Sequence, residues 1–355
     1  MTTKEKWLLL LLTSLSLSLA APLLLGGFSQ FRLLYRLSIG AVLLLILLKL
    51  ISWAFNALRA QFLLSLSGRE LGFLNAASTT IAAEFAGVTT PGAVGMAATY
   101  AFLFNRLGLS LGRATGLVGI IVVTDLFLYG TIMPAAALIQ VIQGGWSYHN
   151  LRLVALSLVV VAGGAYFFWA LIRYHRRVYG FIGRYLAIIP WLVRRRWSLG
   201  RATVDFLRAV RVLRQMSWSE RLALYLITLD FWLPRYLILL LVIDMMNQSV
   251  PAAYLLLTQA MLHLAGQASF IPGGAGVEEG GYAAFMSPFM GADVVAFTLL
   301  VWRTFTFYWY IVVGGPIFVY EAGRAAWDLL GKTTAETLPE VLAPKSGADE
   351  ARPQP

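Results

Sequence analysis

The chain has 355 residues, of which 59% are hydrophobic, 13% are charged and none is cysteine. This composition is typical of multi-pass membrane proteins and excludes disulfides and cysteine-based metal sites. The net charge is +11, but twelve arginines lie in the single segment Arg173–Arg221, which has only two acidic residues. We therefore expect a cytoplasmic loop there rather than a surface that binds nucleic acid.

The first apolar stretch, Trp7–Leu25, follows Lys4 and Lys6 and is predicted to be an uncleaved membrane anchor. It is longer than the usual apolar region of a signal peptide, although the sequence SLAAP leaves a cleaved signal peptide as the alternative. A second span is predicted at Ile39–Phe55. We place the charged segment after it, Arg59–Arg69, on the cytoplasmic side.

Two further apolar stretches, 74–104 and Tyr254–Met290, are each interrupted by a Pro-Gly motif. Proline removes a backbone donor, and glycine allows tight and left-handed turns. Arms of about 10–15 residues rise roughly 15–22 Å, too short for a hydrocarbon core of about 30 Å. We predict two re-entrant hairpins, with tilted or short full spans as the alternative. The residues at the two breaks are Pro91, Gly92 and Gly95, and Pro272, Gly273, Gly274 and Gly276.

The remaining predicted spans are Ala114–Leu138, Leu151–Leu171, Leu222–Met246 and Val294–Tyr320. Each half of the chain then has the order span, span, broken hairpin, span. Because Lys and Arg concentrate on the segments assigned to the cytoplasm, the two hairpins are expected to enter from opposite sides. This pattern predicts an all-α polytopic membrane protein with about six transmembrane helices and two re-entrant hairpins in an inverted repeat, a common transporter plan.

The predicted domains follow from this repeat. The first repeat is residues 1–142, the second is 143–331 with its basic loop at 173–221, and 332–355 is a disordered tail. Both termini are expected in the cytoplasm. Arginines 201, 208, 211 and 214 lie among apolar residues, which favours an interfacial helix on anionic headgroups. A solvated basic linker is the alternative.

Seven ionisable residues of the predicted membrane segments are the candidate substrate-binding or translocation residues. They are Glu84, Asp125, Asp230, Arg235, Glu278, Glu279 and Arg303. An unpaired charge at that depth costs about 2.5–3.5 kcal/mol, so each is expected to find a partner or water. Two interpretations stay open for these residues: they line a substrate path, or they form ion pairs that only hold the helices together. We expect Glu279 and Arg303 to face one shared cavity, where Arg303 could bind a lipid phosphate.

Soluble catalytic signatures are absent from the sequence. There is no HExxH, P-loop or dinucleotide motif. We therefore expect no catalytic residue, no metal and no cofactor, and a transporter rather than an enzyme. His263, on the first arm of the second hairpin, is expected to be packed rather than catalytic.

The run PGGAGVEE, from Pro272 to Glu279, is followed by a last span with a central Arg303. This arrangement resembles the transmembrane region of the lysylphosphatidylglycerol synthase/flippase family, over roughly Trp7–Trp327. The family pattern PGGxGxxE matches Pro272, Gly273, Gly274, Gly276 and Glu279, and its last-span arginine and its aspartate after the first hairpin match Arg303 and Asp125.

The resemblance is weaker at the first hairpin. Ala93 and Met96 occupy positions that are often charged in the family, and Ile121 and Val122 replace a Glu-Arg pair. These departures leave the substrate open. The resemblance implies a flippase-like membrane protein. The soluble aminoacyl-transferase domain of bifunctional members is expected to be missing, so no synthesis of lysyl-lipid is expected.

We thus predict a lipid translocase of the cell inner membrane that moves an anionic or lipid-linked headgroup. The expected partners are membrane phospholipids or a lipid-linked substrate, anionic headgroups at the basic loop, and either a further copy of the chain or a separate lipid-modifying enzyme. The alternative function is a non-transporting scaffold of a lipid-modifying or glycosyl-transfer enzyme.

Overall fold

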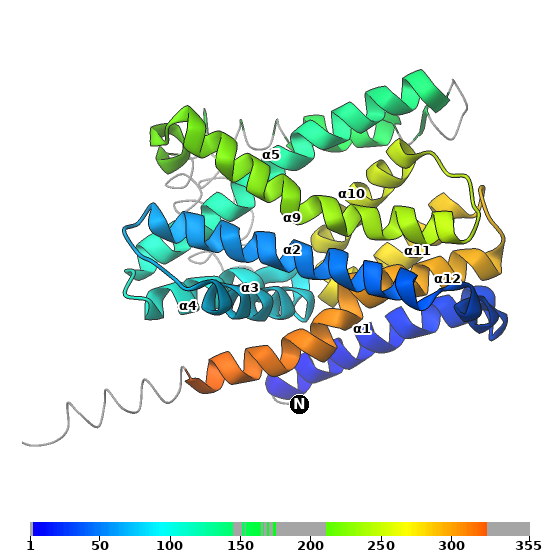
Figure 1. The fold of residues 1–355 in the computed structure, drawn as a ribbon, viewed down its shortest axis with the longest axis horizontal. Coiled ribbons are helices and arrows are strands. Elements are labelled where there is room, and N and C mark those ends of the chain that lie inside the picture. Colours follow the sequence, from blue (N-terminus) through cyan, green and yellow to red (C-terminus); the bar gives the residue numbers. More distant parts are fainter. Residues whose placement is uncertain are drawn as a thin grey trace, which may run out of the picture.

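The computed structural model describes residues 3–144, 151–152, 154–164, 166, 169, 173–174 and 211–324. All regular elements within these ranges are helical (Figure 1). The prediction of an all-α protein is therefore confirmed. Most of the basic loop and all of the predicted tail lie outside the described residues, so the predictions for those segments stay predictions.

Four of the described helices are long and apolar enough to cross a membrane. At 1.5 Å per residue, 27 or more residues rise about 40 Å, which exceeds a hydrocarbon core of about 30 Å. A fifth candidate is a bent pair, in which the part Leu12–Gly26 of α1 (Thr3–Gly26) is followed at 92° by η1 (Ser29–Arg36). The four are α2 (Ile39–Ser65), α5 (Leu111–Gly144), α9 (Trp218–Met245), and the helix that begins as α12 (Ala292–Arg303) and continues to Arg324.

The predicted span Leu151–Leu171 is described only in part, as the short apolar helix Val154–Gly164. The number of spans therefore stands at four or five among the described residues, against the six predicted. The missing span falls on a stretch that the structure describes incompletely.

Helix α2 is longer than the sequence analysis predicted. Ser38 caps its N-terminus, its hydroxyl accepting a hydrogen bond of 3.1 Å from Ala41 N. The helix then runs past Phe55 as far as Ser65. The expectation that Arg59 belongs to the connection after this span is therefore wrong. Arg59 lies within the helix and is buried, because the apolar run continues around it.

Both predicted hairpins are present. The first consists of α3 (Phe73–Val88), the turn η2 (Pro91–Ala93) and α4 (Val94–Arg106). The second consists of α10 (Ala252–Ala268), the turn η4 (Pro272–Gly274) and α11 (Val277–Met286). All four arms have 17 residues or fewer, about 25 Å or less of helix, which is shorter than a hydrocarbon core of about 30 Å.

The two breaks share one backbone geometry. Gly92 and Gly273 have φ of 60° in both turns, and the next residues, Ala93 and Gly274, also have positive φ. Such conformations favour glycine. The motifs then diverge, because Gly95 lies inside α4 whereas Gly276, with φ of 83°, precedes α11.

The order α2–α3–η2–α4–α5 recurs as α9–α10–η4–α11–α12. Helices α2 and α9 pack along one another and run in opposite directions (Figure 1). Since each hairpin follows its long helix by a short connection, the hairpins approach the centre of the molecule from opposite ends. Their turns, η2 and η4, meet there, and α1 packs against α12 beside them.

Candidate functional site

The two hairpin tips border one cavity of about 140 Å³. Six charged side chains line it, one from each of α2, α3, α5, α9, α11 and α12. They are Arg59, Glu84, Asp125, Arg235, Glu278 and Arg303. With three cations and three carboxylates, the lining is balanced in formal charge. Aromatic side chains, among them Phe231, Trp232, Trp302 and Phe307, form much of the remaining wall.

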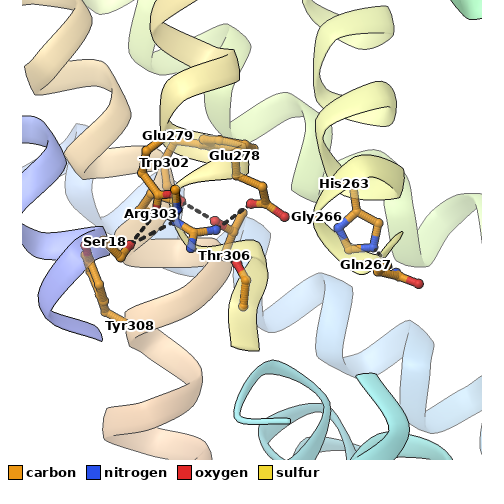
Figure 2. A network of polar contacts seen from close by, with 12 residues as sticks. Ser18, His263, Gly266, Gln267, Glu278, Glu279, Trp302, Arg303, Thr306 and Tyr308 are labelled. Atoms are coloured by element: carbon orange, nitrogen blue, oxygen red, sulfur yellow. Dashed lines mark hydrogen bonds and ion pairs between the residues drawn. The ribbon is translucent and has the colours of Figure 1, made fainter. Parts of the chain in front are cut away.

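Arg303 is the most completely enclosed of these cations, with 1% of its surface exposed. Its Nε lies 2.8 Å from Glu279 Oε1, and its Nη1 pairs with Glu278. Its Nη2 donates to the carbonyl oxygen of Gly273 at 2.9 Å. Figure 2 shows Arg303 at the centre of this network, between the two glutamates and Ser18 of α1. The last long helix is thereby tied to the tip of the second hairpin.

Glu279 and Arg303 are in direct contact, but only Arg303 borders the cavity, so the structure does not show both facing it. Glu278 lines the cavity, whereas Glu279 is 1% exposed and does not. Glu279 accepts hydrogen bonds from Ser18 and, at 2.7 Å, from Gly276 N. The carboxylate therefore caps α11 from within the chain, so this backbone donor is already engaged.

A second ion pair joins α2 to α5. Arg59 Nη1 lies 2.6 Å from Asp125 Oδ1, and the indole Nε1 of Trp232 donates to the same oxygen at 3.0 Å. The guanidinium of Arg59 also lies 4.7 Å from the ring centre of Phe231. Its Nε is buried and forms no hydrogen bond with any described residue.

A third, looser pair joins the first hairpin to α9. Arg235 Nη1 lies 3.6 Å from Glu84 Oε2, beyond hydrogen-bond distance. Glu84 accepts a hydrogen bond from Asn56 through its other carboxylate oxygen. Arg235 Nη2 donates to the hydroxyl of Tyr310 at 2.7 Å. The Glu84 Oε2 atom is buried and has no hydrogen-bond partner among the described residues.

The glycines of the second tip allow these close approaches. A Cβ atom on Gly273 would lie 2.2 Å from the ring of Phe307, and one on Gly274 would lie 2.7 Å from the Cα of Gly266. Gly266 in turn makes room for the Glu278 side chain, whose Oε1 would lie 2.6 Å from a Cβ there. Any side chain at these positions would push the tip away from its neighbours.

The first tip is held differently. The Thr90 hydroxyl donates to the carbonyl oxygen of Ala86 at 2.6 Å and accepts from Gly95 N at 2.7 Å. It therefore links the end of α3 to the start of α4. A Cβ on Gly95 would lie 2.3 Å from the same Ala86 oxygen, which explains the glycine.

Not all the predicted site residues reach the cavity. Gly92, Gly273 and Gly274 border it; Asp230, Glu279, Pro91, Gly95, Pro272 and Gly276 do not. Asp230 is half-buried and forms no hydrogen bond or ion pair with any residue that the structure describes. Of the expected partner or water, no partner is found among those residues.

Several residues of the site were missed. Arg59, Asn56, Ser18 and Tyr310 gave no sequence signal, because each depends on contacts with distant segments. Lys49 could have been found, since it lies inside the predicted span Ile39–Phe55. It is 1% exposed, and its ammonium lies 3.8 Å from the ring centre of Tyr310.

His263 lies on α10 and borders the cavity. Its ring packs edge-on against Trp232, with 5.0 Å between the ring centres, and its Nε2 lies 2.7 Å from Gln267 Nε2. Figure 2 shows this His–Gln pair apart from the Arg303 network. The expected packing role agrees with these contacts.

A comparison with known protein families matches residues 9–314 to a family described as the lysylphosphatidylglycerol synthase TM region. The match includes both hairpins and all six charged residues of the cavity. No curated protein matches the chain.

Proposed function

The chain belongs to the lysylphosphatidylglycerol synthase TM-region family, and on that premise we propose that it is a lipid translocase. It is an integral membrane protein with several membrane-spanning helices, and its family points to lipid metabolism or transport. In the proposed activity, an anionic or lipid-linked headgroup crosses the bilayer through the cavity between the hairpin tips.

One observation carries the proposal: two broken hairpins that approach from opposite ends meet at a single charged cavity. Charged side chains inside a membrane are costly and are typical of substrate or ion pathways. Broken helices whose tips meet near the middle of the bilayer are a recurring plan of transporters with alternating access. Movement of one hairpin unit against the other would open the cavity to either side in turn.

The proposal also specifies the membrane, the orientation and the partners of the protein. The protein lies in the cell inner membrane with both termini in the cytoplasm, and its direct partners are phospholipids or a lipid-linked substrate. It acts as a transporter rather than an enzyme, either as a homo-oligomer or beside a separate lipid-modifying enzyme. Anionic headgroups would bind its basic loop.

Lipid flipping in proteoliposomes tests the proposal, with a panel of labelled lipids that differ in headgroup. The full-length protein should accelerate the flipping of at least one anionic lipid. Glu278→Gln should reduce this rate strongly, because Glu278 lines the cavity and pairs with Arg303. Glu70→Gln, an equal change at an exposed position, is the matched control.

Two outcomes would oppose the proposal. No acceleration for any headgroup would favour the scaffold function instead. Equal rates for wild type and Glu278→Gln would remove the cavity from the transport path.

A further inference from the structure

We propose that Arg59 and Arg235, rather than Arg303, bind the phosphate group of the lipid headgroup. This inference rests on the proposed function and names its binding site. The first reason is that Arg303 is already fully engaged by the protein. All three of its nitrogen atoms already have acceptors, supplied by Glu278, Glu279 and Gly273. An arriving anion would have to displace the contacts that hold the second hairpin.

Arg59 and Arg235 are held less completely. Arg59 has 2% of its surface exposed and borders the cavity, yet its Nε has no hydrogen-bond partner among the described residues. The carboxylate nearest Arg235 Nη1 lies 3.6 Å away, beyond hydrogen-bond distance. Arg59 Nε is a buried donor without an acceptor among the described residues. Such a donor is costly, so a ligand oxygen beside it would be stabilising.

The two guanidiniums share one neighbour, the ring of Phe231. Their central carbon atoms lie 4.7 Å and 4.8 Å from its centre. They come from α2 and α9, which pack along one another and hold equivalent places in the repeated order of elements. Two planar guanidiniums on rigid helices are well suited to phosphate oxygens, which they can bind through paired hydrogen bonds.

In the structure Asp125 pairs with Arg59, and Glu84 lies 3.6 Å from Arg235 Nη1, so an arriving phosphate would meet both carboxylates. The lining has equal numbers of positive and negative charges, and an added phosphodiester would leave one negative charge in excess. The carboxylates therefore compete with the phosphate for the two arginines. Removing one carboxylate charge should tighten phosphate binding, whereas removing an arginine should weaken it.

Calorimetry on the full-length protein in detergent tests this assignment, with dihexanoyl-phosphatidylglycerol as the probe and dihexanoylglycerol as its phosphate-free control. Arg59→Gln and Arg235→Gln should each weaken binding of the phospholipid about tenfold or more, as expected for the loss of a charge-assisted pair. Asp125→Asn should tighten it about threefold or more. Arg36→Gln, at an exposed position, should leave it unchanged.

The opposite response of Asp125→Asn separates binding from structure. If Asp125→Asn weakens binding as Arg59→Gln does, the pair is structural and the assignment is overturned. The double variant Arg59→Gln/Asp125→Asn removes both partners and should stay folded. It should unfold at nearly the same temperature as wild type and still bind weakly. Wild-type affinity in that variant would overturn the assignment.

A parallel titration with inorganic phosphate distinguishes a lipid phosphate from free phosphate as the ligand. Binding of the phospholipid through both arginines without flipping would support the site and oppose translocation. Binding of inorganic phosphate but not of the phospholipid would oppose the lipid assignment. Flipping that is insensitive to both arginine substitutions would leave translocation standing and overturn the phosphate site.

Discussion

Arg303 Nη2 donates a 2.9 Å hydrogen bond to the carbonyl oxygen of Gly273. The bond satisfies a backbone acceptor at the break of the second hairpin, where the helical ladder is interrupted. Immediately after Arg303 the helix widens into π-helical turns at Thr304–Tyr308 and Tyr310–Gly314. Such turns are frequent at functional sites. The tip and the last long helix are therefore in direct contact, and substitutions in either should affect both.

Gly273→Ala should destabilise the protein and abolish flipping. The residue has φ of 60°, and its Cβ would lie 2.2 Å from the ring of Phe307. The backbone strain alone costs about 1–2 kcal/mol, and the clash adds to it. Gly280→Ala is the matched control, since it is exposed on α11 and its Cβ would meet nothing within 4 Å. Thermal unfolding in detergent measures the loss of stability, and the proteoliposome assay measures the loss of flipping. Equal effects of Gly273→Ala and Gly280→Ala would argue against a tight tip.

Arg303→Gln and Glu279→Gln should each impair flipping, and the double variant should lose much less than the sum. Removal of one partner of a buried pair typically costs about 3–5 kcal/mol, because the remaining charge is left uncompensated. The contact of 2.8 Å between Arg303 Nε and Glu279 Oε1 makes the two losses interdependent. A double-mutant cycle on unfolding and on flipping measures the coupling. Strictly additive losses would show that the pair does not act as a unit.

Thr90→Val should destabilise the first hairpin by about 0.5–2 kcal/mol, the usual cost of a lost helix cap. The substitution keeps the shape of the side chain but removes the hydroxyl that bonds Ala86 O and Gly95 N. Thr99→Val on α4 is the control, because its hydroxyl forms no hydrogen bond with any described residue. Denaturation in mixed micelles compares the free energies of unfolding of the two variants. A loss as large for Thr99→Val would point to a general effect of valine.

The predicted topology can be tested by cysteine labelling, which the absence of native cysteine makes simple. Ser249→Cys, in the exposed connection between α9 and α10, should react with an impermeant reagent added outside intact cells. Ser110→Cys, in the exposed connection between α4 and α5, should react only after permeabilisation. The positive-inside rule places the two connections on opposite sides. The reverse labelling pattern would invert the proposed orientation, and labelling of both from outside would exclude it.

The sequence alone was sufficient to predict an all-α membrane protein and the two breaks. Long apolar runs predict spans, and Pro91–Gly92 and Pro272–Gly273 interrupt such runs with adjacent residues that disfavour a regular helix. The similar depth of Glu279 and Arg303 was also predictable. The two residues lie on consecutive elements, α11 and α12, so helix length alone brings them to similar depth.

Only the tertiary structure decided which charges meet and which face the cavity. Arg59 pairs with Asp125, 66 residues away, and Ser18 contacts Glu279 across 261 residues. A periodic pattern places a side chain on a face of its own helix, but it carries no information about which distant helix packs there. For the same reason, the sequence could not distinguish a cytoplasmic Arg59 near a helix end from one that is buried and neutralised by Asp125. That difference depends on helix packing.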